Sequence, residues 1–490
     1  MTHLYTNTPA YFGDISEAMR LFIDTRKIER MEEDECPTDA HPTEGYAVRH
    51  CLRQRDGIVV SAAALFDGDT CVAENTYECD VGDGALAQKR SEKRASKISV
   101  YRAMLMHFKT PMPWGSLTGI RPTKLLRDSE SRIGEDSAKA LFLNEFDVSQ
   151  NKYDLAKNIV TAQQKLMPQS DNDIDVYIGI PFCVTRCAYC SFASSTPDVF
   201  KGAEAQYMDA LMAELDAAEQ LLGGRRVRAM YIGGGTPTAL GEDNLKRVVM
   251  RAADIAGLDA EFTVEAGRPD TITRGKLDII KAAGARRISV NAQTLRDDTL
   301  ARIGRQHTAE EFMDAFALAR AAGFDDINVD IIAGLPGEAA ADVRETLSRI
   351  IDLAPENITV HTLAVKRASQ FAKDNMAAFP TSDETGVMVD AARGMLSKAG
   401  YHPYYMYRQK YMKGSQENTG YALRGHDCLY NIDNMEEVCD VLAFGAGAIS
   451  KRIFGGGARI ERAANVKDLR EYIARHTEMI GRKHMLFKKR

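Results

Sequence analysis

The sequence lacks several features that mark whole classes of protein. No run approaches the roughly eighteen consecutive apolar residues of a membrane span, so none is predicted. The net charge of the 490-residue chain is only −6, which gives no reason to expect nucleic acid or an anionic membrane as a partner. The first residues, MTHLYTNTPAYFGD, have neither the basic start nor the apolar core of a signal peptide. We therefore expect a cytoplasmic location.

Cysteine is informative through its spacing. The nine cysteines are an odd number and are not spread like the disulfide framework of a small domain. Cys183, Cys187 and Cys190 lie together in VYIGIPFCVTRCAYCSF, residues 176–192. Three thiolates at this spacing can hold three corners of a four-iron cluster and leave the fourth iron open to a ligand. Zinc also binds thiolates, but its sites usually pair two CxxC units, and the sequence has no second pair.

Length and composition predict a multidomain protein. A chain of 490 residues with 44% hydrophobic and 27% charged residues suggests roughly two to four globular domains. Residues 1–170 are expected to form an N-terminal accessory α+β domain, which ends in the polar, Pro-containing segment 167–173. Its predicted strands and helix are 46–53, 57–65, 70–79 and 85–108.

From Asp175 onward, short β-branched runs alternate with helical stretches. This rhythm is typical of parallel strands joined by right-handed helical crossovers, and six such units make a partial (β/α)6 barrel. The predicted strands are 175–182, 228–235, 261–267, 286–293, 326–334 and 357–365. The predicted helices are 203–222, 242–256, 270–283, 308–322 and 338–353. The expected fold class is α/β, with this barrel over 171–400.

The last part of the chain changes character. Residues 401–490 are expected to form a small C-terminal α+β domain that covers the substrate. Residues 466–480 have the pattern of an amphipathic helix. The basic end KHMLFKKR is interpreted as a solvated tail without a function of its own.

Unusual residues stand where the barrel strands are predicted to end, which is where the active site of a parallel barrel gathers. The cysteine loop follows the first strand. The second strand ends in GGGTP, residues 233–237, whose glycines let a charged ligand approach the backbone closely. The next three strands carry Glu265, Gln293 and Asp330. Each of these residues alone is typical of an ordinary loop, but five strand ends in succession predict one site.

This combination resembles a known superfamily. The CxxxCxxC spacing, Tyr189 before the last cysteine and GGGTP after the second strand resemble radical S-adenosylmethionine (SAM) enzymes. YIGIPFCVTRCAYCSF, GGGTPT, Gln293, the step Gly304-Arg305-Gln306 and VDIIAGLPGE are similar to the oxygen-independent coproporphyrinogen III oxidase group, over about 174–455. GSLTGIRPTKLL and YYMYRQKYMKGSQENTGYA resemble the HemZ-type branch of coproporphyrinogen dehydrogenases.

The resemblance implies a role for each site residue. Cys183, Cys187 and Cys190 would ligate a [4Fe–4S] cluster whose open iron binds SAM. The residues expected to contact SAM are Tyr189, Gly234, Gly235, Thr236, Glu265, Gln293, Arg305 and Asp330. The last three of these leave open a second SAM molecule. Tyr177 would lie near the cofactor and is the candidate catalytic residue.

The resemblance also implies a reaction and partners. Reductive cleavage of SAM would give a radical that takes a hydrogen atom from a propionate of coproporphyrinogen III, a tetrapyrrole. Loss of CO₂ and one electron would leave a vinyl group, and two rounds would give protoporphyrinogen IX. A low-potential electron donor such as flavodoxin or ferredoxin would be needed. We expect a monomer with no nucleic-acid partner.

The sequence departs from its relatives at two places, and two alternatives stay open. Gly179 stands where many relatives have histidine, which bears on the second SAM. Glu417 stands where haem-chaperone relatives carry a histidine that binds haem. The alternatives are a haem-trafficking chaperone and a radical SAM enzyme on another substrate. Candidate cations for the substrate propionates are Arg121, Lys124, Arg408, Lys410 and Lys413, although exposed solubilising charge is the better explanation for any one of them.

Overall fold

The computed structural model describes most of the chain. The described residues are 2–23, 28–32, 45–119, 121–190, 202–365, 369, 371, 379–410 and 412–488, without the side chain of Lys413. They fall into two compact units. The N-terminal unit comprises residues 1–120 and 125–156, and the barrel unit comprises residues 121–124 and 157–490. The division into three domains at 170 and 400 stays a prediction.

The N-terminal unit is built on a sheet of the order β2-β1-β3-β4-β5. Its strands are β1 (Thr2–Thr6), β2 (Ile28–Glu32), β3 (Tyr46–Arg55), β4 (Ile58–Asp67) and β5 (Thr70–Asp80). β1 lies parallel to both β2 and β3, whereas β3, β4 and β5 form an antiparallel meander. The helices α1 (Phe12–Met19) and α2 (Ala85–Phe108) bury their apolar side chains with the sheet in one core. Three further helices follow, α3 (Pro122–Ile133), α4 (Glu135–Ala140) and α5 (Gln150–Gln163).

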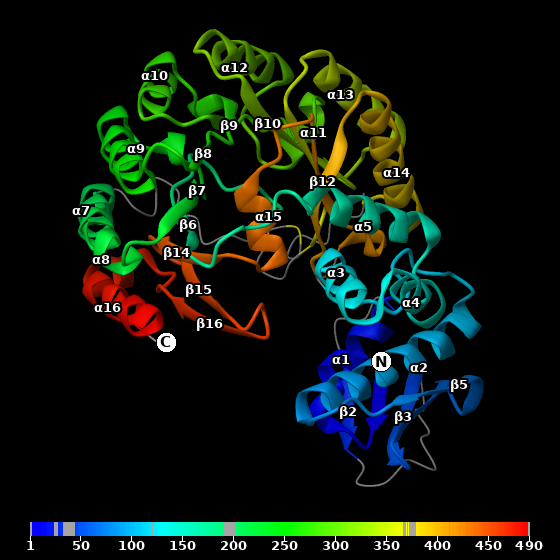
Figure 1. The fold of residues 1–490 in the computed structure, drawn as a ribbon. Coiled ribbons are helices and arrows are strands. Elements are labelled where there is room, and N and C mark those ends of the chain that lie inside the picture. Colours follow the sequence, from blue (N-terminus) through cyan, green and yellow to red (C-terminus); the bar gives the residue numbers. More distant parts are fainter. Residues whose placement is uncertain are drawn as a thin grey trace. The chain divides into compact units, whose positions relative to one another are not determined.

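The barrel unit contains one long curved sheet (Figure 1). Its central strands run parallel in sequence order, which confirms the partial barrel. They are β6 (Asp173–Ile180), β7 (Arg226–Gly234), β8 (Glu261–Glu265), β9 (Arg287–Ser289), β10 (Asp326–Ala333) and β11 (Asn357–Thr362). The later strands extend both edges of the same sheet, with β13 beside β11 and β14 parallel to β6. They are β12 (His402–Tyr407), β13 (Asn418–Ala422), β14 (Asp440–Phe444), β15 (Ile449–Phe454) and β16 (Arg459–Ala464).

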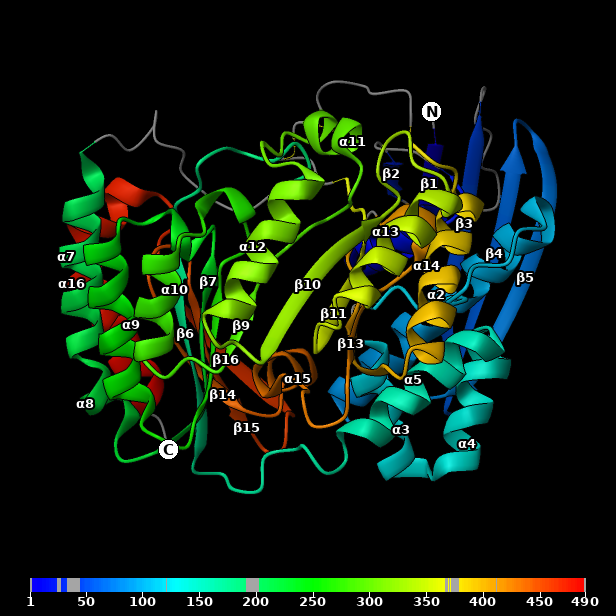
Figure 2. The ribbon, with the colours of Figure 1, turned by 90° about the horizontal axis from the view of Figure 1, so that it is seen from above.

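The helices of the barrel unit cover the outer face of this sheet, as Figures 1 and 2 show. They are α7 (Ala203–Asp216), α8 (Ala218–Leu222), α9 (Glu242–Ala256), α10 (Arg274–Ala282), α12 (Ala309–Ala321), α13 (Ala340–Asp352), α14 (Ser382–Lys398) and α16 (Leu469–Lys488). The short helix α11 (Asp297–Arg302) lies at the carboxyl ends of the strands, where Leu300 packs in one cluster with Ala188. One helix, α15 (Leu429–Glu436), lies on the concave side instead. It packs against tyrosines of β6, β7 and β12 there.

Alternation along β6 explains which side chains face which way. Ile174, Val176, Ile178 and Ile180 are fully buried against the outer helices, as expected for one face of a strand. The residues between them, Asp175, Tyr177 and Gly179, therefore point into the lumen of the barrel. Apolar contacts on the outer face hold the sheet to its helices, so the side chains that face the lumen can be polar.

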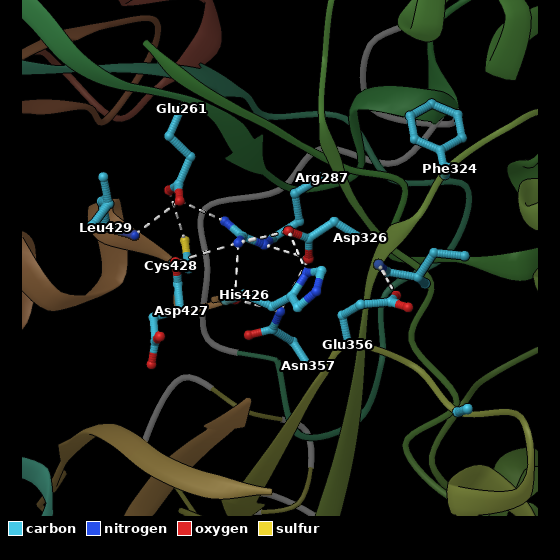
Figure 3. A network of polar contacts seen from close by, with 12 residues as sticks. Glu261, Arg287, Phe324, Asp326, Glu356, Asn357, His426, Asp427, Cys428 and Leu429 are labelled. Carbon is cyan, nitrogen blue, oxygen red and sulfur yellow. Dashed lines mark hydrogen bonds and ion pairs between the residues drawn. The ribbon is translucent and has the colours of Figure 1, made fainter. Parts of the chain in front are cut away.

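A buried polar network lies at the amino-terminal ends of the barrel strands, where β8 to β11 begin (Figure 3). The guanidinium of Arg287 pairs with Glu261 and Asp326 at 2.9 Å each and donates to the backbone oxygen of His426. Glu261 also accepts a hydrogen bond from the Leu429 N–H at the start of α15. The network ties the strand starts to α15, because each buried charge needs a partner.

The C-terminal end differs from the prediction of a solvated tail. Residues 483–488 belong to α16, and Lys483 is fully buried. Its ammonium pairs with Glu214 of α7, which also accepts from the Tyr472 hydroxyl and the Gly445 N–H. Composition indicated a tail because lysine is usually exposed, whereas a distant carboxylate in the core overrides that preference.

Candidate active site at the carboxyl ends of the strands

The cysteine loop leaves the end of β6 and is fixed by contacts on both sides. Arg268 donates to the Thr185 hydroxyl at 2.6 Å and forms a bidentate pair with Asp270. The Ala188 N–H donates to the Ile303 carbonyl at 2.9 Å, which ties the loop to the end of α11. Cys183, Cys187 and Cys190 are all partly exposed. Hydrogen bonds therefore fix the backbone of the loop, and its three thiols remain accessible.

The glycine turn after β7 packs directly against this loop. The Gly235 and Thr236 N–H groups donate to the carbonyls of Ile180 and Phe182, each at 2.7 Å. A Cβ on Gly235 would lie 2.5 Å from the Phe182 carbonyl oxygen and 3.0 Å from Cys183 Sγ. The Thr236 hydroxyl lies 3.5 Å from the same sulfur. Glycine at 235 is thus required for the close approach of the turn to the first cysteine.

Glu265 at the end of β8 points at the same turn. Its carboxylate accepts hydrogen bonds from the Tyr231 hydroxyl at 2.6 Å and from the Gly234 N–H at 3.3 Å. Burial raises the pKa of Glu265 to about 7, although both hydrogen bonds favour the charged form. The carboxyl is therefore poised between its two protonation states near neutral pH.

Three tyrosines stack on one another inside the barrel. Tyr231 and Tyr430 have ring centroids 4.5 Å apart, and Tyr177 lies 6.4 Å from Tyr231 and 6.1 Å from Tyr430. Burial raises the pKa of Tyr177 well above its ordinary value, and the nearby Glu265 adds to the shift. The phenol consequently stays protonated at neutral pH.

Gly179 makes room for this stack. A Cβ at position 179 would lie 3.3 Å from the Tyr177 ring and 3.5 Å from the Phe444 carbonyl oxygen. The Tyr177 hydroxyl also approaches a Cβ placed on Gly234 to 3.4 Å. A side chain at 179 would therefore be in tight contact with the Tyr177 ring, which would have to shift by a few tenths of an ångström.

Gln293 and Asp330 are brought together by the backbone. The Gln293 N–H donates to the Asp330 carbonyl at 2.8 Å, and Gln293 has φ = 65°, a left-handed conformation that costs about 1 kcal/mol or more for a non-glycine residue. The Asp330 carboxylate accepts from Asn328 Nδ2 at 2.8 Å and faces His361 Nε2 at 3.6 Å. Burial works to raise the pKa of Asp330, but these partners outweigh it and hold the pKa below its usual value.

Arg305 connects the cysteine loop to β8 and β9. Its guanidinium donates to the Gly267 carbonyl at 3.0 Å and approaches the Tyr189 hydroxyl at 3.4 Å. Burial works against the charged form, but Tyr189 and Cys187 outweigh it and raise the pKa of Arg305. The guanidinium stays charged beside Cys187.

The comparisons with known proteins agree with this arrangement. A sequence model of the Radical SAM superfamily matches residues 177–350. The Oxygen-independent coproporphyrinogen-III oxidase-like protein HemZ of Bacillus subtilis is 38% identical over 385 residues, which is 76% of this chain and 77% of HemZ. The chain belongs to the HemZ-like group of the radical SAM superfamily. The Heme chaperone HemW of Bacillus subtilis is 30% identical over 313 residues, 61% of this chain and 75% of HemW.

A solved structure gives the fold of this HemZ-like chain a counterpart. Coproporphyrinogen III oxidase (HemN) from Escherichia coli, described as a radical SAM enzyme, superposes with a TM-score of 0.52. It is 25% identical, and the match covers 66% of this chain and 73% of HemN. No helix within the described part of the HemZ-like chain is long and apolar enough to cross a bilayer.

The cofactors of this superfamily are a [4Fe–4S] cluster and SAM. The described residues fit both. Three accessible thiols on one held loop provide the soft donor set of a cluster with an open iron. Beside them, Gly235 leaves space at Cys183 that any side chain would fill, and a poised carboxylate faces the turn. The part that each residue plays toward SAM stays a prediction.

The structure adds residues that sequence reasoning missed or undervalued. Tyr231, Tyr430 and His361 were not among the predicted site residues. Tyr231 lies two residues before Gly233 and so on the same face of β7, a signal that alternation along the strand contained. Tyr430 carried no such signal, because it reaches the lumen from α15.

Of the five cations predicted to bind propionates, Arg121 and Arg408 already contact other protein groups, and Lys413 has a side chain outside the described residues. Arg121 pairs with Glu437 at 3.2 Å, and Arg408 is buried with its guanidinium on the Ser415 oxygens. Burial lowers the pKa of Arg408 to about 10. The side chain of Lys413 lies outside the described residues.

Proposed function

We propose that this protein is a radical SAM enzyme that oxidatively decarboxylates two propionate side chains of coproporphyrinogen III to give protoporphyrinogen IX. Removing one hydrogen atom, CO₂ and one electron from each propionate leaves a vinyl group. The electron goes to an external acceptor, and a low-potential donor such as flavodoxin or ferredoxin supplies the electrons for SAM cleavage. When bound, the cluster and SAM supply the hydrogen-abstracting radical.

The observation that carries the proposal is the extent of the match to HemZ. It spans 77% of that protein, which is named as an oxidase-like protein, and therefore reaches beyond the superfamily region at 177–350. The fold match to HemN supports the same reading, because that relative is named as the oxidase itself.

The chain's own residues would bind and orient the cofactor. The ionised Glu265 would accept hydrogen bonds from sugar hydroxyls of SAM, with Tyr231 and the Gly234 N–H fixing its orientation. Gly234 and Gly235 would let the amino-acid end of SAM approach the backbone near Cys183. The tyrosine stack would form an apolar wall on the concave side that keeps water from the reacting carbon.

His361 would face the substrate side of this wall. It is 27% exposed in the ion pair with Asp330, so its ring borders the open part of the lumen. Its imidazole would donate a hydrogen bond to a propionate carboxylate, whereas Asp330 would keep the ring oriented.

The second candidate function is haem trafficking, which the 30% identity to HemW favours. Glu417 argues against it. Where the chaperones carry a haem-binding histidine, this chain has a buried carboxylate that is 2% exposed. The Glu417 carbonyl accepts from the Thr362 hydroxyl at 2.7 Å, and the next residue, Asn418, accepts from the Thr362 N–H at 2.7 Å. The segment is thus held against β11, and a carboxylate replaces the imidazole.

An anaerobic assay tests the proposal. The purified protein is reconstituted with iron and sulfide and incubated with SAM, a reductant and coproporphyrinogen III, and 5′-deoxyadenosine and porphyrinogen products are measured. We expect both protoporphyrinogen and deoxyadenosine. Replacing Cys183 by Ala should abolish both together with the cluster absorbance, whereas Cys71→Ala, at an exposed cysteine outside the loop, should change neither.

Haem binding by the same preparation separates the two candidates. An enzyme without chaperone function binds added haem weakly and turns over the porphyrinogen. Tight stoichiometric haem binding without turnover would support trafficking and contradict the proposal. Deoxyadenosine formed without decarboxylated product would leave a radical enzyme for another substrate.

A further inference from the structure

Three buried side chains from separate elements converge near the amino-terminal end of β6, and the cysteine loop follows the opposite end of this strand. Asp175 lies on β6, Asp433 on α15, and Cys439 immediately before β14. One ligand atom from each lies within 4.8 Å of the other two. The side chains are 0%, 0% and 4% exposed, respectively. Two carboxylates and a thiol thus form one buried cluster.

Three of the four carboxylate oxygens in this cluster lack a hydrogen-bond partner among the described residues. Neither oxygen of Asp175 makes a hydrogen bond, and neither does Oδ1 of Asp433. The other oxygen of Asp433 accepts from Arg228 Nε at 2.6 Å. Buried polar groups are nearly always paired, and an unpaired buried carboxylate costs several kcal/mol, about 3–5 by the effect of removing a partner. The three free oxygens therefore point to an additional group between them.

The cations beside this cluster already donate hydrogen bonds to other groups. Arg228 also donates to the Leu166 carbonyl, and the Lys451 ammonium donates to Asn434 Oδ1. A divalent ion bound to the three free carboxylate oxygens and the thiolate would supply the partner that these oxygens lack. The donor set of one soft and two hard ligands fits zinc, which binds cysteine and aspartate in tetrahedral sites.

We propose that Asp175, Asp433 and Cys439 bind a structural divalent metal ion, with zinc the best match. Arg228 would then be the outer partner that orients a ligating carboxylate, as such residues do at many metal sites. The ion would fasten α15 to the β6–β14 pair. Because α15 also carries Tyr430, the ion would hold the tyrosine stack in place from the end of the barrel opposite the cysteines.

Metal analysis of the reconstituted holoenzyme tests this site. We expect one zinc per chain in addition to the cluster iron, and loss of the zinc with retention of the iron in Cys439→Ala. Cys428→Ala is the matched control, because Cys428 is equally buried near the start of α15 but lies outside the triad. Zinc that persists in Cys439→Ala, or its absence from the parent even after zinc is added, would overturn the proposal.

A spectroscopic test removes the cluster from the measurement. In the full chain with Cys183, Cys187 and Cys190 all changed to Ala, added Co²⁺ should give a thiolate-to-cobalt charge-transfer band that saturates at one equivalent and is displaced by zinc. The further change Cys439→Ser should remove the band, and Cys428→Ala should keep it. A band that depends on Cys428 and not on Cys439 would contradict the assignment.

Thermal unfolding distinguishes a metal from a shared proton. If zinc binds, the melting temperature of the same cluster-free chain rises with added zinc, and Asp175→Asn abolishes this response. If the two carboxylates instead share a proton, Asp175→Asn folds at least as stably as its parent, neither chain responds to zinc, and the proposal fails.

Discussion

The Tyr231 hydroxyl donates a 2.6 Å hydrogen bond to Glu265 across the β7–β8 pair, directly below the glycine turn. This bond favours the charged carboxylate, whereas burial opposes it and raises the pKa of Glu265 to about 7. Because the pKa is raised on folding, the group's contribution to stability is complete below about pH 4.5 and is lost as the pH rises through about 7. The proposed binding of SAM by this carboxylate would follow the opposite trend, since it needs the ionised form.

Tyr231→Phe should therefore weaken SAM binding near neutral pH. The change keeps the stacked ring and removes the donor, so the pKa of Glu265 rises further and the pH at which SAM binding is half-maximal rises with it. Loss of a hydrogen bond to a charged group costs about 1.5 kcal/mol, which is about tenfold in affinity. Equilibrium binding of SAM measured on both sides of pH 7 checks this. Tyr430→Phe, which lies in the same stack, should leave the pH dependence unchanged.

Gly235→Ala should disrupt the cysteine loop. The added Cβ would meet the Phe182 carbonyl at 2.5 Å and Cys183 Sγ at 3.0 Å, so the backbone or the ligand must move. We expect less than about half of the parent's cluster iron, because a metal site tolerates only small displacements of its ligands. Gly241→Ala is the control, since nothing lies within 4 Å of a Cβ there. Equal iron contents in the two variants would show that the close approach is not required.

His361→Ala should remove stability in a pH-dependent way. The pKa of Asp330 is held below its usual value in the folded protein, so this group stabilises above about pH 3.8 and loses that contribution as the pH falls through its folded value. The variant should lose about 0.5–1.5 kcal/mol of unfolding free energy at neutral pH. Urea unfolding should show the loss maintained down to about pH 4 and shrinking as the pH falls further below 3.8. A loss of equal size at neutral pH and well below pH 3.8 would mean that packing, and not the ion pair, is responsible.

Lys483→Met should destabilise the barrel unit strongly. Lys483 and Glu214 are both fully buried, and removal of one partner from a buried pair costs about 3–5 kcal/mol because it strands the other charge. Urea unfolding measures the cost. Arg475→Met breaks the exposed pairs with Glu471 and Glu478 on the same helix and should cost less than about 1 kcal/mol. A similar cost for both variants would contradict the buried role of Lys483.

Sequence periodicity predicted the regular elements well. Residues 242–256 and 85–108 form α9 and α2 with the predicted bounds. Helical spacing and repeated strand patterns depend on local chemistry, so a single sequence contains them. The prediction of a strand over 286–293 was too long, since β9 ends at Ser289. Beyond Ser289 the regular pairing with β10 is interrupted, and it resumes as a single bridge between Gln293 and Ile331. Gln293 has a left-handed conformation there, which an apolar pattern does not reveal.

The site was predictable only in part for a related reason. The cysteines, the glycine turn and Glu265 each follow a strand, so strand order alone placed them at one edge. Tyr430 and Lys483 reach partners that are distant in the sequence. Tyr430 does so from a helix on the concave side, and Lys483 does so from the last helix, 269 residues away from Glu214. Such contacts are decided by tertiary packing, and neither composition nor period encodes them.

The reaction that we propose for this protein is the decarboxylation of a porphyrinogen. Mass spectrometry of the porphyrinogen pool, combined with measurement of released CO₂, tests it most directly in the anaerobic reconstituted system. We expect each coproporphyrinogen III to lose two CO₂ on conversion to protoporphyrinogen IX, with at least one 5′-deoxyadenosine formed per CO₂. Deoxyadenosine formed while the porphyrinogen keeps all of its carboxylates would contradict the proposal.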